Sequence, residues 1–177
     1  ATMTELADHI ESVHHQYLRD ALPRLEGLLD KVVQAHGDHH PELDEVRRTF
    51  RSVRAELETH MAKEEMILFP MCRQLEQEDV RPQFHCGSVR SPIFVMEMDH
   101  DSVGRALEHM RDLTHGFAPP AEACGTYRAM LDGLRELEAD LHMHIHEENN
   151  ILFPRAVDRE AALAPARMGL RTLLVTQ

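Results

Sequence analysis

The chain has 177 residues, of which 42% are hydrophobic, and it carries a formal net charge of −12. This length and apolar content suffice for one domain with a full core. Because the chain is acidic and lacks a cluster of Lys and Arg, it offers no surface for nucleic acid or an anionic membrane. Its apolar runs are too short to span a membrane, so we expect a soluble, cytoplasmic protein. Three cysteines without CxxC spacing indicate free thiols.

Four long segments with helical periodicity follow one another, and no long segment alternates as a strand does. Pro23 and Pro70 lie inside the first two segments, where we expect a kink or a local break. Ser91, followed by Pro92, predicts the N-cap and first turn of the third helix. Pro154 lies near or just past the expected end of the fourth. The expected helices are residues 4–35, 42–78, 91–115 and 122–150.

This order of elements predicts an all-α fold, an up-down antiparallel four-helix bundle with short connections. We assign residues 1–157 to the bundle. The remaining residues, 158–177, form a C-terminal tail that has room for a short helix.

An internal repeat is the most informative feature of the sequence. The eleven residues from His60 to Pro70 return 84 residues later, from His144 to Pro154, with six positions identical. The identical positions are a His, a Glu four residues later, and the run Ile-Leu-Phe-Pro. The repeat therefore preserves polar chemistry as well as packing.

The repeat extends upstream to His15 and His100, each followed by an Ala-Leu pair at the same distance. The separation from His15 to His60 is 45 residues, and from His100 to His144 it is 44. The bundle is therefore predicted to consist of two copies of one helical hairpin. Each copy offers two imidazoles and one carboxylate.

Helical periodicity places these polar residues among the core-facing positions, which recur in steps of three and four. A buried carboxylate without a partner is costly, and two in one core repel each other. A bound cation resolves both problems. A single histidine on such a face is more often a hydrogen-bonded core residue, but four on four helices within a repeat favour a metal site. The expected core-facing positions are His15, Leu18, Leu22, Leu25, Leu29, Val32, Val53, Leu57, His60, Glu64, Ile67, Met71, Met96, His100, Val103, Leu107, Met110, Leu137, Leu141, His144, Glu148 and Ile151.

The number and type of ligands predict a dinuclear centre. Residues at i and i+4 of a helix lie about 5 to 6 Å apart on one face, so each His and the following Glu can reach a common point. Six ligands exceed the four of a tetrahedral zinc ion. Mixed imidazole and carboxylate ligands with open positions are typical of non-haem iron, although manganese accepts the same set. We predict two iron ions, bridged by Glu64 and Glu148 and by an oxo or hydroxo group from solvent.

At these residues the chain resembles the hemerythrin-like (HHE cation-binding) domains, and most closely the di-iron proteins that repair iron centres in response to nitric oxide. The resemblance covers residues 11–155. It depends on the paired HxxxE-x-x-ILFP segments and on the stretches 85–93 and 95–101. Carried over residue by residue, the ligands implied by the family are the same six as those predicted above: His15, His60, Glu64, His100, His144 and Glu148.

Two further residues are expected near the centre. The resemblance places Glu97, one turn before His100, near an access path. His14 points about 100° away from His15 on a helix, toward solvent or toward the outer side of the ligands.

The chain departs from its apparent relatives in two respects. Oxygen-carrying hemerythrins have a further His one turn after the third-helix ligand, where this sequence has Gly104. That difference implies two similar, open irons, and it disfavours a dedicated oxygen carrier. Many repair proteins of the family also carry an N-terminal module with adjacent cysteines, which the sequence from Ala1 onward does not contain.

The resemblance implies the repair of damaged iron-sulfur clusters, by iron donation or by nitric oxide binding and reduction. The implied partners are nitric oxide, O2, iron-sulfur client proteins and an electron donor. The alternative is a module that reversibly binds or senses O2 or nitric oxide. A di-iron oxidase of the ferritin-like kind is a third reading, but such bundles carry Glu-x-x-His and more carboxylates, whereas the motif here is reversed and rich in nitrogen.

Overall fold

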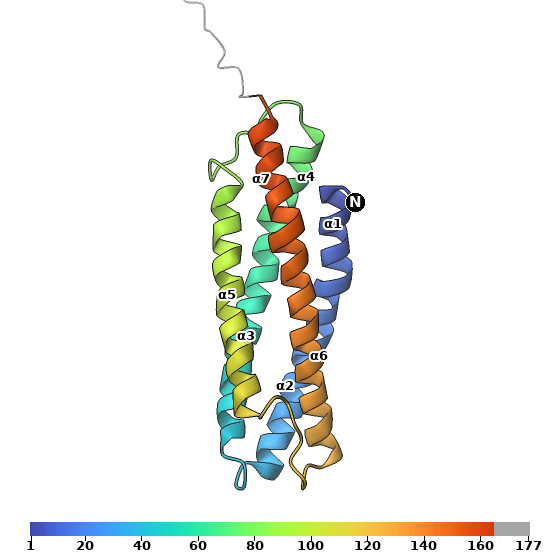
Figure 1. Ribbon diagram of the computed structural model, residues 1–177, viewed down its shortest axis with the longest axis vertical. Helices are drawn as coiled ribbons and strands as arrows, with labels where there is room; N and C mark the ends of the chain where they lie inside the picture. Colours follow the sequence, from blue (N-terminus) through green and yellow to red (C-terminus); the bar gives the residue numbers. More distant parts are fainter. Residues whose placement is uncertain (165–177) are drawn as a thin grey trace, which may run out of the picture.

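The structure, a computed structural model that describes residues 1–164, consists of four long helical rods packed side by side (Figure 1). Three of the rods contain a short segment of π-helix, labelled η, in which hydrogen bonds join residues five apart. The elements are α1 Met3–His9, η1 Ile10–His15, α2 Gln16–His36, α3 Glu42–Lys63, η2 Glu64–Leu68, α4 Phe69–Gln77, α5 Arg90–Leu113, α6 Gly125–Glu147, η3 Glu148–Leu152 and α7 Phe153–Ala162.

The rods form an up-down bundle, which confirms the predicted fold class. Helix α2 packs on α3 and α6, and α3 packs on α5, while α1 meets α4 at the other end of the bundle (Figure 1). The described residues contain no strand beyond an isolated bridge between Val80 and Ala164. Within residues 1–164, no helix combines the length and the apolar character that crossing a membrane requires.

The apolar core consists of two clusters stacked along the bundle. One fills the end that contains α2 and the first part of α6, and its buried members include Leu18, Leu57 and Leu141. The other fills the end that contains α1, α4 and α7, and it includes Ile10 and Leu68. On each rod, the sequence between the two clusters holds the repeated histidines and glutamates. These side chains therefore form a polar layer between the two apolar clusters. The layer consists of His15, His60, Glu64, His100, His144 and Glu148.

The π-helical segments shift the core-facing positions by one residue. Ile67 was expected to face the core, but it is 50% exposed, and its neighbour Leu68 is fully buried. The same shift occurs in the second copy of the repeat, where Ile151 is half-buried and Leu152 is fully buried. A π turn contains one residue more than an α turn, so every later side chain on the rod rotates by about 100°. The other expected core-facing positions are buried.

The prolines disturb the rods less than predicted. Helix α2 continues through Pro23 without a break. Pro70 and Pro154 each lie in the first turn of a helix, directly after a π-helical segment. Each rod continues through its proline, although the proline has no N–H to donate to the preceding turn. The fourth rod consequently continues beyond Asn150 to Ala162, which corrects the expected end of that helix.

The start of α5 also differs from the prediction. Ser91 is not the N-cap, because the helix begins at Arg90 and the Ser91 hydroxyl donates to the Cys86 carbonyl instead. The buried carboxylate of Glu160, on α7, accepts hydrogen bonds from the Val89 N–H at 3.0 Å and from the Ser88 hydroxyl at 2.6 Å. A negative charge at a helix N-terminus is favourable. A side chain distant in sequence thus performs the capping that local sequence suggested for Ser91.

The expected C-terminal tail begins inside α7, since residues 158–162 are helical. Its remainder from residue 165 lies outside the described residues. The division of the chain at residue 157 stays a prediction.

The register shift gives a test of the π-helical segments. Deleting Asn150, an exposed residue whose side chain hydrogen-bonds with His146, removes one residue from η3. Because the deletion converts the π turn into an α turn, Leu152 and Phe153 should take the core-facing positions three and four residues after Glu148, and the free energy of unfolding should change by about 1 kcal/mol or less. Denaturant titration measures the change. Deletion of Glu136, an exposed residue in the regular part of α6, is the matched control, because it rotates every later side chain of the rod by about 100° and should lower the free energy of unfolding by about 3 kcal/mol or more. Equal losses in the two variants would contradict the proposed register.

Candidate metal centre

The polar layer is positioned by the three π-helical segments. Segments η2 and η3 begin at Glu64 and Glu148, and η1 ends at His15. The carbonyl of Glu64 accepts from the N–H of Phe69, and the carbonyl of Glu148 accepts from that of Phe153, so each bond spans five residues. Such single π turns occur frequently at functional sites. The repeat therefore preserves an unusual backbone feature along with its side chains.

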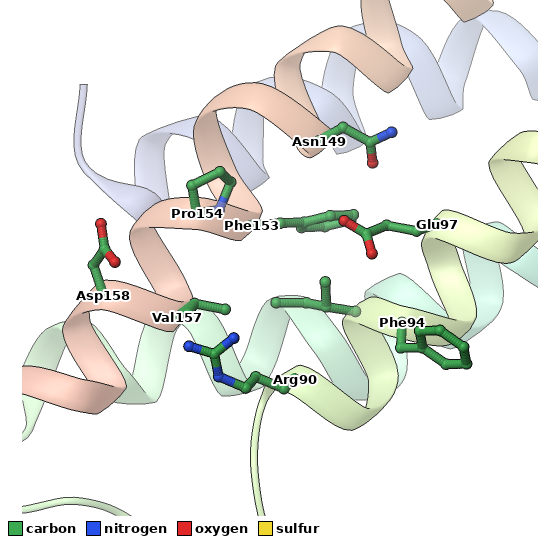
Figure 2. A pocket seen from close by; sticks show the side chains of 9 residues that line it. Arg90, Phe94, Glu97, Asn149, Phe153, Pro154, Val157 and Asp158 are labelled. Carbon is green, nitrogen blue, oxygen red and sulfur yellow. The ribbon is translucent and has the colours of Figure 1, made fainter.

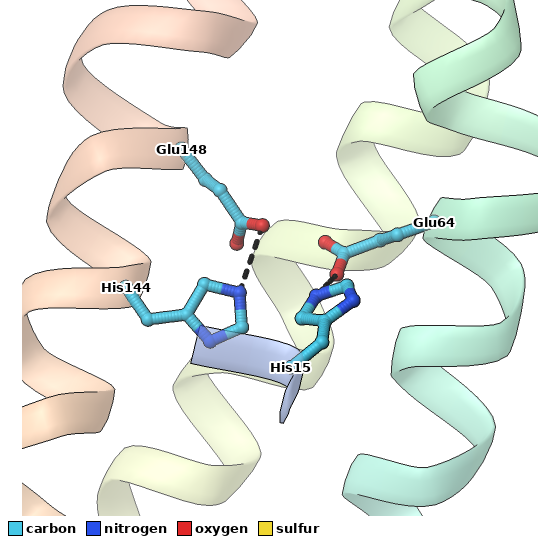
Figure 3. Close-up of side chains that lie close together, drawn as sticks. All are labelled: His15, Glu64, His144 and Glu148. Carbon is cyan, nitrogen blue, oxygen red and sulfur yellow. Dashed lines mark hydrogen bonds and ion pairs between the residues drawn. The ribbon is translucent and has the colours of Figure 1, made fainter. Parts of the chain in front are cut away.

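All six predicted ligands converge inside the bundle, and none is more than 6% exposed. Their ligand atoms form two groups, each within 4.8 Å, and both carboxylates belong to both groups. Figure 3 shows the first group, in which His15, Glu64 and the pair His144 and Glu148 point toward one another from three rods. The His15 group contains His15, His144, Glu64 and Glu148, and the His60 group contains His60, His100, Glu64 and Glu148.

Each carboxylate spans one histidine of each group. Glu64 lies 3.1 Å from Nε2 of His15 through Oε2 and 3.1 Å from Nε2 of His60 through Oε1. Glu148 lies 3.0 Å from Nε2 of His144 and 3.0 Å from Nε2 of His100. Only one contact of each carboxylate is aligned as a hydrogen bond, and Glu64 Oε1 and Glu148 Oε2 remain without one.

Oxygen acceptors on the outer side orient three of the four imidazoles. Nδ1 of His15 lies 2.7 Å from Glu65, Nδ1 of His60 lies 3.3 Å from Asp99, and Nδ1 of His100 lies 2.9 Å from Asn149. An Nδ1–H that donates outward leaves the lone pair of Nε2 pointing inward, as in histidines that bind metals. Nε2 of His60 and Nε2 of His100 accordingly face each other at 3.1 Å.

His144 differs from the other three histidines. Its Nδ1 is buried and has no hydrogen-bond partner. Its ring lies parallel to the ring of His14, with centroids 5.2 Å apart and an interplanar angle of 8°. The Nδ1 atom of His14 lies 2.9 Å from Asp140. The structure thus places His14 on the outer side of the ligands, behind His144.

The charges in this layer shift the pKa values of its members. Burial raises the pKa of Glu64 to about 8, and the charge of Glu148 adds to the shift. Burial alone would also raise the pKa of Glu148, but the imidazoles of His144 and His100 lower it below its usual range. Burial alone would lower the pKa of His144, whereas Glu148 raises it to about 9. Protons on Glu64 and His144 therefore balance the charge that a cation would otherwise balance.

These six residues are suited to bind two cations. Inward-facing imidazole lone pairs and carboxylate oxygens without aligned donors attract a positive charge from several sides at once. Six nitrogen and oxygen ligands around two points match the preference of non-haem iron better than that of tetrahedral zinc.

Two hollows adjoin the layer. A small cavity of about 10 Å³, room for roughly one water-sized molecule, lies against three of the histidines. Apolar side chains form the rest of its wall. The lining residues are Leu57, His60, His100, Val103, Leu141, His144 and Ile145.

The second hollow is a surface pocket of about 400 Å³, in which Glu97 lies opposite Asn149 and Phe153 (Figure 2). Asn149 is the partner of His100, and the ring of Phe153 lies parallel to that of His100 at 6.1 Å. The exposed Glu97 thus lines a hollow whose wall contacts a ligand candidate, while its role in access stays a prediction.

Sequence reasoning missed the outer partners of the histidines. Glu65 and Asn149 lie inside the repeat and Asp99 lies in the stretch 95–101, but none of them is an identical position of the repeat, and the roles of these three and of Asp140 depend on contacts between rods. Glu65 also pairs with Arg19, a contact between the first and second rods. The only available signal was their position beside a ligand candidate or one turn before it.

The raised pKa values predict how the metal-free protein responds to pH. Between about pH 5 and 9, native Glu64 and His144 bind protons that the unfolded chain releases at its ordinary pKa values of 4.5 and 6.5. The free energy of unfolding should therefore fall as pH rises through this range. The lowered pKa of Glu148 acts only at lower pH. Denaturant titrations from pH 5 to 9 measure the slope, and Glu64→Gln should reduce it. Stability that rises with pH would contradict the assignment.

Comparison with known proteins agrees with this geometry. The hemerythrin HHE cation-binding domain matches residues 6–156. A probable iron-sulfur cluster repair protein of Haemophilus influenzae is 39% identical over 160 residues, which are 90% of this chain and 68% of that protein. The iron-sulfur cluster repair protein YtfE of Yersinia pseudotuberculosis is 41% identical over 159 residues, which are 89% of this chain and 67% of that protein. The chain therefore belongs to the hemerythrin HHE cation-binding family, as its repeated motifs predicted.

Proposed function

We propose that the polar layer holds two iron ions. One is bound by the two histidines of the His15 group and the other by the two histidines of the His60 group. Glu64 and Glu148 are shared by both ions, and solvent supplies an oxo or hydroxo bridge. The membership of both carboxylates in both groups, within 4.8 Å of every other ligand atom of the group, supports the sharing. The nitrogen-rich ligand set supports iron.

We further propose that the protein repairs iron-sulfur clusters, as the names of its relatives from Haemophilus influenzae and Yersinia pseudotuberculosis indicate for those proteins. The single observation that carries the proposal is the buried pair of His and Glu groups between two apolar clusters. Repair proceeds by donation of iron, by binding and reduction of nitric oxide, or by both. Iron-sulfur proteins are then the clients, and an electron donor keeps the iron reduced.

The residues of the chain orient the ligand histidines, balance the charge of the ions and exclude water from the polar layer. Glu65, Asp99 and Asn149 hold three imidazoles with Nε2 directed inward. The two apolar clusters close the bundle on either side of the layer, which keeps bulk water from competing for the ligands. When bound, reduced iron supplies one-electron chemistry and open positions for a diatomic molecule. Apart from His60, His100 and His144, the small cavity has an apolar wall, which favours an uncharged molecule over an ion.

Glu148→Ala tests the sharing of carboxylates. The variant removes one ligand from both ions, so iron content should fall from about two per chain to one or none, as measured by elemental analysis. Circular dichroism should show that the helices persist, because the variant leaves both apolar clusters of the bundle intact. Glu136→Ala, at an exposed position of the same helix, is the matched control and should retain full iron. Two irons retained in the Glu148 variant would contradict the shared role.

The cavity also favours a second candidate function, the reversible binding of O2 or nitric oxide. Protein that has been reduced under anaerobic conditions is mixed with O2, and the result distinguishes repair from reversible binding. For a repair protein we expect rapid and irreversible oxidation, followed by optical absorption. A stable spectrum that reverts when O2 is removed would instead assign the protein to reversible binding.

A further inference from the structure

A third cluster of potential ligands lies beside the polar layer, on the side of His144. It consists of His9, His14 and Glu147, whose ligand atoms all lie within 4.8 Å of one another. Neither the repeat nor the core-facing periodicity indicates it. His9 and Glu147 belong to none of the groups described above, and His14 contacts the layer only through its ring.

The π-helical segment η1 brings the two histidines of this cluster together. His9 and His14 are five residues apart, and in an α-helix they would point about 140° away from each other. Hydrogen bonds across five residues widen the turn and return His14 to the face of His9. Their rings consequently meet edge to face, with centroids 5.8 Å apart. The same turn positions His15 in the layer, so one backbone feature serves both clusters.

The cluster contains a buried imidazole without a partner. The side chain of His14 is 6% exposed, and its Nδ1 lies 2.9 Å from Asp140, which leaves the Nε2 lone pair directed away from Asp140. Nε2 of His14 is buried and has no hydrogen-bond partner, and neither has Oε2 of Glu147, 3.8 Å away. Oε1 of Glu147 lies 3.7 Å from Nε2 of His9. Both separations exceed hydrogen-bond length.

We propose that His9, His14 and Glu147 form an outer site for one divalent first-row transition-metal ion. Two imidazoles and one carboxylate with the remaining positions open to water are the ligand set of mononuclear ferrous sites. Ligands with bonds of about 2.1 Å lie roughly 3.0 Å apart on one face of an octahedral ion and roughly 3.4 Å apart around a tetrahedral ion, so the separations of 3.7 and 3.8 Å between Glu147 and the two histidines must shorten when an ion binds. Among the described residues, His9 and His14 are the only basic groups within 4.0 Å of the Glu147 carboxylate.

The outer site connects solvent with the polar layer. The side chain of His9 is 50% exposed and that of Glu147 is 17% exposed, so an ion reaches them from outside. On the inner side, the ring of His14 stacks on His144, and Glu147 precedes Glu148 in the chain. This role rests on the proposed iron centre. Iron binds at the outer site on its way into or out of the His15 group.

Metal counting tests the site. Iron-loaded protein is dialysed against Zn²⁺, and iron and zinc are then measured together by elemental analysis. Wild-type protein should hold about one zinc more per chain than His9→Ala or Glu147→Gln, with equal iron in all three. His142→Ala is the matched control, because it removes an exposed histidine from the same helix as Glu147 and should keep the wild-type zinc count. Equal zinc in the wild type and the two site variants would overturn the outer site.

The transit role has a separate readout. Removal of iron by an excess of chelator should be several-fold slower in His9→Ala and Glu147→Gln than in the wild type and in His142→Ala. Equal rates would overturn the transit role. A wild-type protein that holds no iron would overturn the proposed iron centre, whereas the difference in zinc uptake would still report on the outer site.

Discussion

The structure depends on the neutralisation of two carboxylates that face each other inside an apolar core. A buried, uncompensated charge costs several kcal/mol, and two of the same sign add their repulsion. In the metal-free chain, protons carry out the neutralisation, as the raised pKa values of Glu64 and His144 show. Two bound cations would neutralise the same carboxylates and would also bind the inward lone pairs of the four imidazoles. Stability and metal affinity therefore oppose each other as pH rises, because the protons that stabilise one state must leave to form the other.

The internal repeat determines how the site is assembled. Each of the two groups combines one histidine from each copy of the hairpin, since His15 joins His144 and His60 joins His100. Each carboxylate likewise spans histidines of both groups. A single hairpin therefore contains neither group, and the centre exists only where the two copies pack together. The two hairpins must therefore pack against each other before either group can form.

The sequence predicted the rods and the six convergent side chains because both follow from periodicity and repetition. It did not predict the one-residue advance from Ile67 to Leu68, because a π turn leaves no mark in a pattern read with steps of three and four. It also predicted Ser91 as the N-cap of α5, whereas the group that caps this helix, Glu160, lies 71 residues from Val89 in the sequence. Asp99 and Asn149 escaped detection for the same reason. Contacts between rods are tertiary, and a local pattern carries no record of them.

The outer partners make the two halves of the centre unequal. In the His60 group, both histidines have an oxygen acceptor at Nδ1, so hydrogen bonds determine the orientation of both rings. In the His15 group, His144 has none, and its ring is positioned by stacking on His14. A ring without a hydrogen bond at Nδ1 reorients more readily than one that has such a bond. We therefore expect the His15 group to hold a metal ion less tightly than the His60 group. The His15 group is also the group beside the outer cluster, so the more labile position and the route to solvent lie on the same side of the bundle.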